Sequence, residues 1–131
     1  MIEAVMHAAQ RLTEALGAEN AALARLDLAA AAELGRSKRQ AADAFEAAFT
    51  AASRSGAHAA GPERARTEEL ATRLRDLTTE NRRLLERAIE LQSRVIETIA
   101  GAARPPGPGT YGAHGRSREG RSGPVSVLSR A

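Results

Sequence analysis

Apolar side chains recur at alternating spacings of four and three along two long runs of this chain, a pattern that keeps one side of a helix facing a partner. In the first run Glu19 is the single polar member of the series Val5, Ala9, Leu12, Leu16, Glu19, Leu23, Leu26 and Ala30. A similar stripe continues through Leu34, Lys38, Ala41, Phe45 and Phe49. The pattern predicts a first helix over about residues 2–53.

Two glycines weaken this prediction locally, because each costs about 1 kcal/mol relative to alanine in a helix interior. Gly17 stands alone, but Gly35 is followed by Ser37 and Gln40, which have the spacing of a capping box that starts a new helix. We therefore expect one continuous first helix, with a break near residue 35 as the alternative.

The second run follows a segment rich in glycine and contains Pro62 and Glu63, which suit the first turn of a helix. Its series is Leu70, Leu74, Leu77, Asn81, Leu84, Ala88, Leu91 and Val95, and Gly101 with Pro105 and Pro106 marks its end. This predicts a second helix over about residues 62–100. Two long helices with a short connection predict an antiparallel hairpin with coiled-coil-like packing.

Composition supports an all-α fold, because only 2% of the residues are aromatic and alanine supplies much of the apolar fraction. We expect one helical domain over residues 1–104. Residues 105–131 are rich in glycine, proline, serine and arginine, and such a segment is expected to be disordered. The tail also carries the positive charge: residues 1–100 have a net charge of −1, and residues 101–131 have +4.

Several classes of function are disfavoured by the sequence. The helical body has balanced charges, so we expect no nucleic-acid partner. There is no cysteine, the three histidines lie far apart, and no nucleophile, base or phosphate loop converges on one place, so we expect neither an enzyme nor a cofactor or metal site. No segment of 18 residues is free of charge, so we expect no membrane insertion and a cytoplasmic location.

The second predicted helix has more apolar surface than a two-helix hairpin can cover. Leu85, Ile89 and Ile96 lie beside the four-three series and widen its apolar arc to roughly 160° on a helical wheel. Exposed apolar stripes usually mark an interaction surface. The stripe therefore predicts either the binding of an apolar helix from another protein or burial in a homodimer.

The two polar residues within the series, Glu19 and Asn81, have two interpretations. A polar residue at such a position often fixes the register and the number of helices at some cost in stability. The alternative is a polar contact to a bound chain.

The order of these elements resembles that of the FlgN-type flagellar export chaperones. The resemblance rests on Glu19, Leu23, Asp27, Leu34 and Lys38 in the first helix, on the stretch "ENRRLLERAIELQSRVIETI" with its Asn81, and on "TYGAHG" at residues 110–115. The last of these resembles the Tyr-x-x-x-Gly ending that is common in the family. The resemblance covers roughly residues 5–115.

This resemblance implies a cytosolic chaperone that binds the C-terminal helical segments of hook-filament junction proteins, prevents their premature assembly and delivers them to the flagellar type III export gate. It implies cargo binding by Leu84, Leu85, Ala88, Ile89, Leu91, Val95, Ile96 and Ile99. It also implies that Tyr111 contacts the cytosolic domain of the gate. The alternative function is a structural coiled-coil scaffold that self-associates without cargo.

Overall fold

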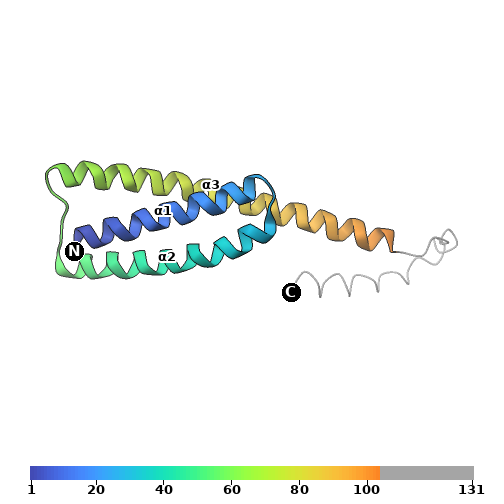
Figure 1. Cartoon of the computed structure of the whole chain (residues 1–131), viewed down its shortest axis with the longest axis horizontal. Coiled ribbons are helices and arrows are strands. Elements are labelled where there is room, and N and C mark those ends of the chain that lie inside the picture. The colour runs from blue at the N-terminus through green and yellow to red at the C-terminus, as the bar shows by residue number, and fades with distance from the viewer. Residues whose placement is uncertain (104–131) are drawn as a thin grey trace, which may run out of the picture. The chain divides into compact units, whose positions relative to one another are not determined.

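The computed structural model describes residues 1–103, and these residues form three α-helices. Helix α1 spans Ile2–Ala24, α2 spans Leu28–Ser55 and α3 spans Pro62–Ala102 (Figure 1). The prediction of an all-α protein is confirmed. The predicted disorder of residues 105–131 and the position of Tyr111 lie outside the described residues.

The predicted two-helix hairpin is wrong in its first half, because a turn at residues 25–27 divides the expected first helix into α1 and α2. The Leu26 backbone N–H donates to the Leu23 carbonyl at 3.0 Å, and the Asp27 N–H donates to the Ala22 carbonyl at 2.9 Å. This pair of bonds is a Schellman motif, with Leu26 in the left-handed conformation at φ 60°. The Asp27 carboxylate then accepts from the Ala30 N–H at 3.1 Å and caps the start of α2.

No break occurs near Gly35, which lies buried inside α2. A β-carbon at this position would lie 2.9 Å from Oε2 of Glu19, a side chain of α1. The glycine therefore permits close approach of another helix, and the capping-box pattern of Ser37 and Gln40 does not start a helix here.

The second connection was easier to predict from its residues. Helix α2 ends at Ser55 and is followed by Gly56 with φ 72°. The Gly56 N–H donates to the Ser53 carbonyl and the Ala57 N–H to the Ala52 carbonyl, which repeats the Schellman motif of the first turn. Helix α3 begins with Pro62 and has Glu63 in its first turn, as expected for the positive end of the helix dipole. It runs to Ala102, so Gly101 lies within the helix.

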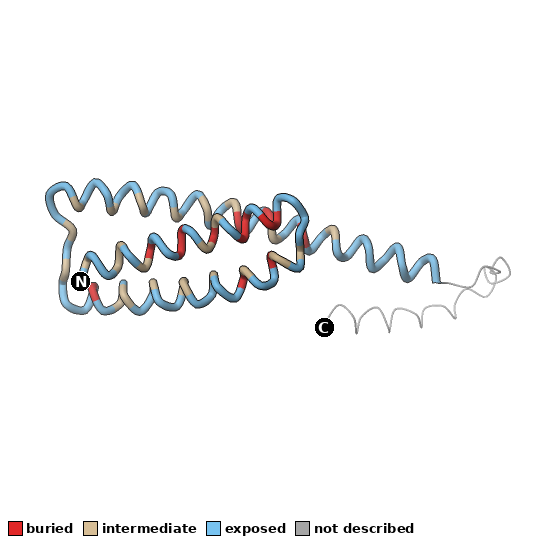
Figure 2. The backbone as a smooth tube through the Cα atoms, viewed as in Figure 1, coloured by how far each residue is buried: buried red, intermediate tan, exposed pale blue. Residues whose placement is uncertain are grey.

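The chain divides into two units, of which the first spans Met1–Ser93 and the second begins at Arg94. The boundary falls within α3, where every described residue from Gln92 to Ala103 is exposed. In the first unit α1 and α2 are antiparallel and lie side by side (Figure 1). Figure 2 shows that most buried positions of this unit lie on α1, with others on the facing parts of α2 and α3.

Candidate functional site

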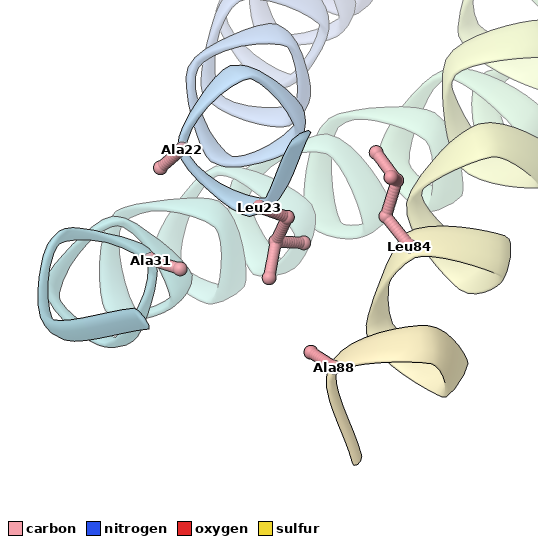
Figure 3. Packing of buried hydrophobic residues seen from close by; sticks show 5 residues of the cluster. All are labelled: Ala22, Leu23, Ala31, Leu84 and Ala88. Carbon is pink, nitrogen blue, oxygen red and sulfur yellow. The ribbon is translucent and has the colours of Figure 1, made fainter. Parts of the chain in front are cut away.

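The predicted cargo surface divides into a buried part and an exposed part. Leu84 and Ala88 are buried in a cluster with Ala22, Leu23 and Ala31. Figure 3 shows both α3 residues on the side that faces Leu23 of α1. Side chains in such a cluster hold α3 against the other helices, so neither offers a surface to a partner.

Two further predicted residues lie at the edge of this cluster. Leu85 is partly buried and packs against it, and Leu91 is also partly buried. Substitution of Leu85 would therefore disturb the folded bundle as well as any partner contact.

The remaining predicted cargo residues are exposed. Ile89 of the first unit has 62% of its surface accessible. In the second unit the exposed fractions are 57% for Val95, 49% for Ile96 and 64% for Ile99. These four residues are called the α3 stripe below. Several isoleucine and valine side chains exposed together on one helix usually mark an interaction surface, because each leaves a large apolar area in water.

Glu19 and Asn81, the two polar residues of the four-three series, meet in a buried network that joins all three helices. Asn81 Nδ2 of α3 donates to Glu19 Oε1 and, at 2.8 Å, to Asn20 Oδ1 of α1. Lys38 Nζ of α2 donates to Glu19 Oε1 at 2.9 Å and to Asn81 Oδ1 at 3.1 Å. Asn20 Nδ2 donates to the Leu77 carbonyl of α3 at 3.2 Å.

This network favours the register interpretation of Glu19 and Asn81. Only 2% of Glu19 and 6% of Asn81 are accessible, and the amide of Asn81 uses both its NH₂ group and its oxygen within the protein. A buried carboxylate requires a paired cation and hydrogen bonds, and Lys38 supplies both. A shift of any helix along its axis would leave these groups unpaired. Asn20 was not singled out from the sequence, although its position beside Glu19 is the signal that could have found it.

An apolar groove lies toward the other end of the first unit, near the α2–α3 connection, and the sequence did not predict it. Its volume is about 400 Å³. The residues that line it are Val5, Met6, Ala9, Phe45, Phe49, Thr67, Leu70, Ala71, Leu74, Arg75, Thr78 and Thr79. The rings of Phe45 and Phe49 have their centroids 6.0 Å apart, and 55% of Phe49 is exposed. Together they leave an apolar surface open that a closed bundle would cover.

Glu80 and Arg83 form a surface pair on α3 in which each residue shifts the pKa of the other. Hydrogen bonds from Arg83, and secondly its charge, hold the pKa of the Glu80 carboxyl below its ordinary value. The same hydrogen bonds raise the pKa of Arg83. The stability from this pair is present above the ordinary pKa of a glutamate and is lost as pH falls through the lowered value. Both side chains are exposed, so the pair is no candidate for acid-base catalysis.

Residues 1–103 contain neither a candidate metal site nor a candidate membrane-spanning helix. No three histidine, aspartate or glutamate side chains of these residues gather where they could hold a metal ion. The helices of the same residues include none with the length and apolar character needed to cross a bilayer.

Comparison of the chain with protein-family models, with curated proteins and with solved structures gave no match.

Proposed function

We propose that this chain is a cytoplasmic flagellar export chaperone that binds the C-terminal helix of a hook-filament junction protein. In this role it prevents premature assembly and delivers its cargo to the type III export gate. The proposed activity is binding alone, without a cofactor or a chemical step. The observation that carries the proposal is the exposure of Ile89, Val95, Ile96 and Ile99 on one helix.

The spacing of the α3 stripe supports a helical ligand. Ile89, Ile96 and Ile99 are separated by seven and three residues, so they share one side of a helix. An amphipathic helix with apolar residues at the same spacings can cover them, as in other helix-to-helix interfaces. Because Leu84 and Ala88 are buried, the proposed cargo surface is narrower than the set that the family resemblance implies.

The direct test is calorimetric titration of the full chain with a peptide that contains the C-terminal helix of a junction protein. A variant that combines Ile89→Glu, Ile96→Glu and Ile99→Glu should bind the peptide about 100-fold or more weakly, because each isoleucine lost from the interface costs over 1 kcal/mol. Wild-type binding should also show a negative heat-capacity change from apolar burial.

The chain offers a matched control for charge. Arg87→Glu with Thr98→Glu changes the net charge by the same −3, at two exposed positions on the opposite side of α3. This variant should bind the peptide like the wild type. If both variants weaken peptide binding equally, the loss of affinity is due to charge repulsion, and the proposed cargo surface is wrong.

The alternative function is a scaffold that self-associates through the same α3 stripe. Light scattering, which measures the oligomeric state, distinguishes this function from that of a chaperone. If the chain is a tight dimer that the three isoleucine substitutions dissociate, and it has no affinity for the peptide, the scaffold function replaces the chaperone proposal.

By resemblance, Tyr111 remains the proposed contact to the export gate. If Tyr111→Ala leaves cargo affinity unchanged and lowers affinity for the cytosolic domain of the gate, the two steps are separate.

A further inference from the structure

We propose that the apolar groove of the first unit binds the C-terminal segment Val125–Leu128 of the same chain. The proposal is independent of the chaperone function, because the groove and the α3 stripe have no residue in common. In this proposal the ligand of the groove is a segment of the same chain, and it covers the open apolar wall.

The groove has the size and character of a binding site. Its volume of about 400 Å³ falls within the roughly 300–1,000 Å³ that is usual for ligand pockets. Its walls combine aliphatic side chains of α1 and α3 with the two phenylalanines of α2, and the short side chains Thr67, Ala71 and Thr78 leave the space between them. Such a surface selects branched aliphatic side chains over polar ones.

The tail contains one group of such side chains. In residues 104–131, valine, leucine, isoleucine, methionine and phenylalanine occur only as Val125, Val127 and Leu128. Everything before them in the tail is dominated by glycine, proline, serine and arginine. Val125 and Val127 are two residues apart, so a segment bound in an extended conformation would present both side chains on one side. The segment can therefore place two adjacent side chains in a groove while Ser126 faces water.

The chain length permits this contact. Residues 104–124 can extend about 70 Å, and this exceeds the roughly 60 Å length of the 41-residue α3, the longest helix in residues 1–103. Because residues 104–124 connect the segment covalently to the first unit's chain, its effective concentration at the groove can reach the millimolar range. A weak intrinsic affinity, such as three aliphatic side chains provide, is then sufficient for occupancy.

The absence of cysteine allows a clean test in the full chain. A nitroxide spin label attached through Ser129→Cys should broaden the methyl signals of Met6, Leu70 and Leu74 in an NMR spectrum. The signals of Leu23 and Leu84, which belong to the buried cluster, serve as reference. Loss of most of the methyl intensity in the groove, with intact reference signals, is the expected result.

Two variants and one control identify the contact from each side. Val127→Ser with Leu128→Ser should restore the groove signals, whereas Ser126→Asn, a polar change between them, should leave the broadening in place. Ala71→Glu introduces a charge at an exposed lining position and should also restore the signals while the circular dichroism of the helices stays unchanged.

Three results would overturn the proposal. The first is the absence of broadening in the groove, and the second is broadening that persists after Val127→Ser with Leu128→Ser. The third uses a mixture of isotope-labelled chain without spin label and unlabelled chain with it. Full broadening in that mixture would assign the contact to the tail of a second copy. None of these experiments includes cargo, so their failure leaves the chaperone proposal unaffected, and failure of cargo binding leaves this one unaffected.

Discussion

Toward the α1–α2 turn, the first unit buries Leu23, Leu84 and Ala88 and satisfies the polar groups of Glu19 and Asn81. Toward the α2–α3 connection, the corresponding α3 residues Leu70 and Leu74 are only partly buried and line an open groove. Both regions follow the same four-three spacing of apolar positions. The difference shows that spacing selects the side of the helix that faces inward, while side-chain size and polar pairing decide how completely it closes.

Small residues explain the closed region. Ala22, Ala31 and Ala88 contribute little volume, and Gly35 contributes no side chain at all, so the helices approach closely enough for one leucine from α1 and one from α3 to fill the space between them. In the open region, Phe45 and Phe49 are large, but several α3 residues that line the groove are short, among them Thr67, Ala71 and Thr78. These short side chains supply too little volume to fill the groove.

The largest expected effect compares one leucine from each region. Leu84→Ala should lower the free energy of unfolding by about 3 kcal/mol, because it removes a fully packed side chain and leaves a cavity. Leu74→Ala should lower it by about 1 kcal/mol, since its side chain is already partly exposed beside the groove. Urea unfolding followed by far-ultraviolet circular dichroism measures both. Equal losses would mean that the two regions are packed alike in solution.

A smaller effect is expected from the cation of the network. Lys38→Met leaves the Glu19 carboxylate buried without its charged partner, which should lower the free energy of unfolding by about 2 kcal/mol. The side chain of Lys38 is 21% exposed, so water can partly replace it. The loss is therefore expected below the value typical of a fully buried pair.

The matched control for this change is Arg36→Met, on the same helix. Arg36 pairs with Glu33 at 3.4 Å, but both side chains are largely exposed, so the loss should stay within about 0.5 kcal/mol. If the two variants behave alike in urea unfolding, the network contributes no more than a surface pair.

Much of this arrangement could be predicted from the sequence, and the failures have specific causes. The four-three series identified helical segments and placed Glu19 and Asn81 on inward-facing sides. It missed the α1–α2 turn because Leu26 fits the apolar spacing and leucine rarely adopts a left-handed conformation. Gly56, at the equivalent place in the second turn, has the residue type that usually marks such a motif. Asp27 was the available signal for a new helix start.

The groove could not be predicted in the same way. A helical wheel shows which residues of one helix are apolar, but it contains no information on the volume offered by the opposing helices. The pairing of Phe45 and Phe49 with Thr67, Ala71 and Thr78 depends on contacts between segments far apart in the chain. The role of Gly35 has the same cause, because the neighbour that requires a glycine there is Glu19 of another helix.

The smallest expected effect separates the two helix-interior glycines. Alanine favours a helix by about 1 kcal/mol over glycine. Gly17→Ala should gain roughly this amount, since nothing lies within 4 Å of the added β-carbon. Gly35→Ala should instead lower the free energy of unfolding by about 1 kcal/mol, because its β-carbon would displace the Glu19 carboxylate from Lys38 and Asn81 and cancel the helical gain.

The Glu19→Ala background tests this reason for the difference. Without the carboxylate the added methyl group of Gly35→Ala meets no close neighbour, so the substitution should become stabilising, like Gly17→Ala in the wild type. A double-mutant cycle in urea measures this coupling. If Gly35→Ala stabilises the wild type as much as Gly17→Ala does, the close approach of α2 to Glu19 does not depend on the glycine. The closed region would then tolerate a larger side chain, and small residues would no longer explain why it differs from the groove.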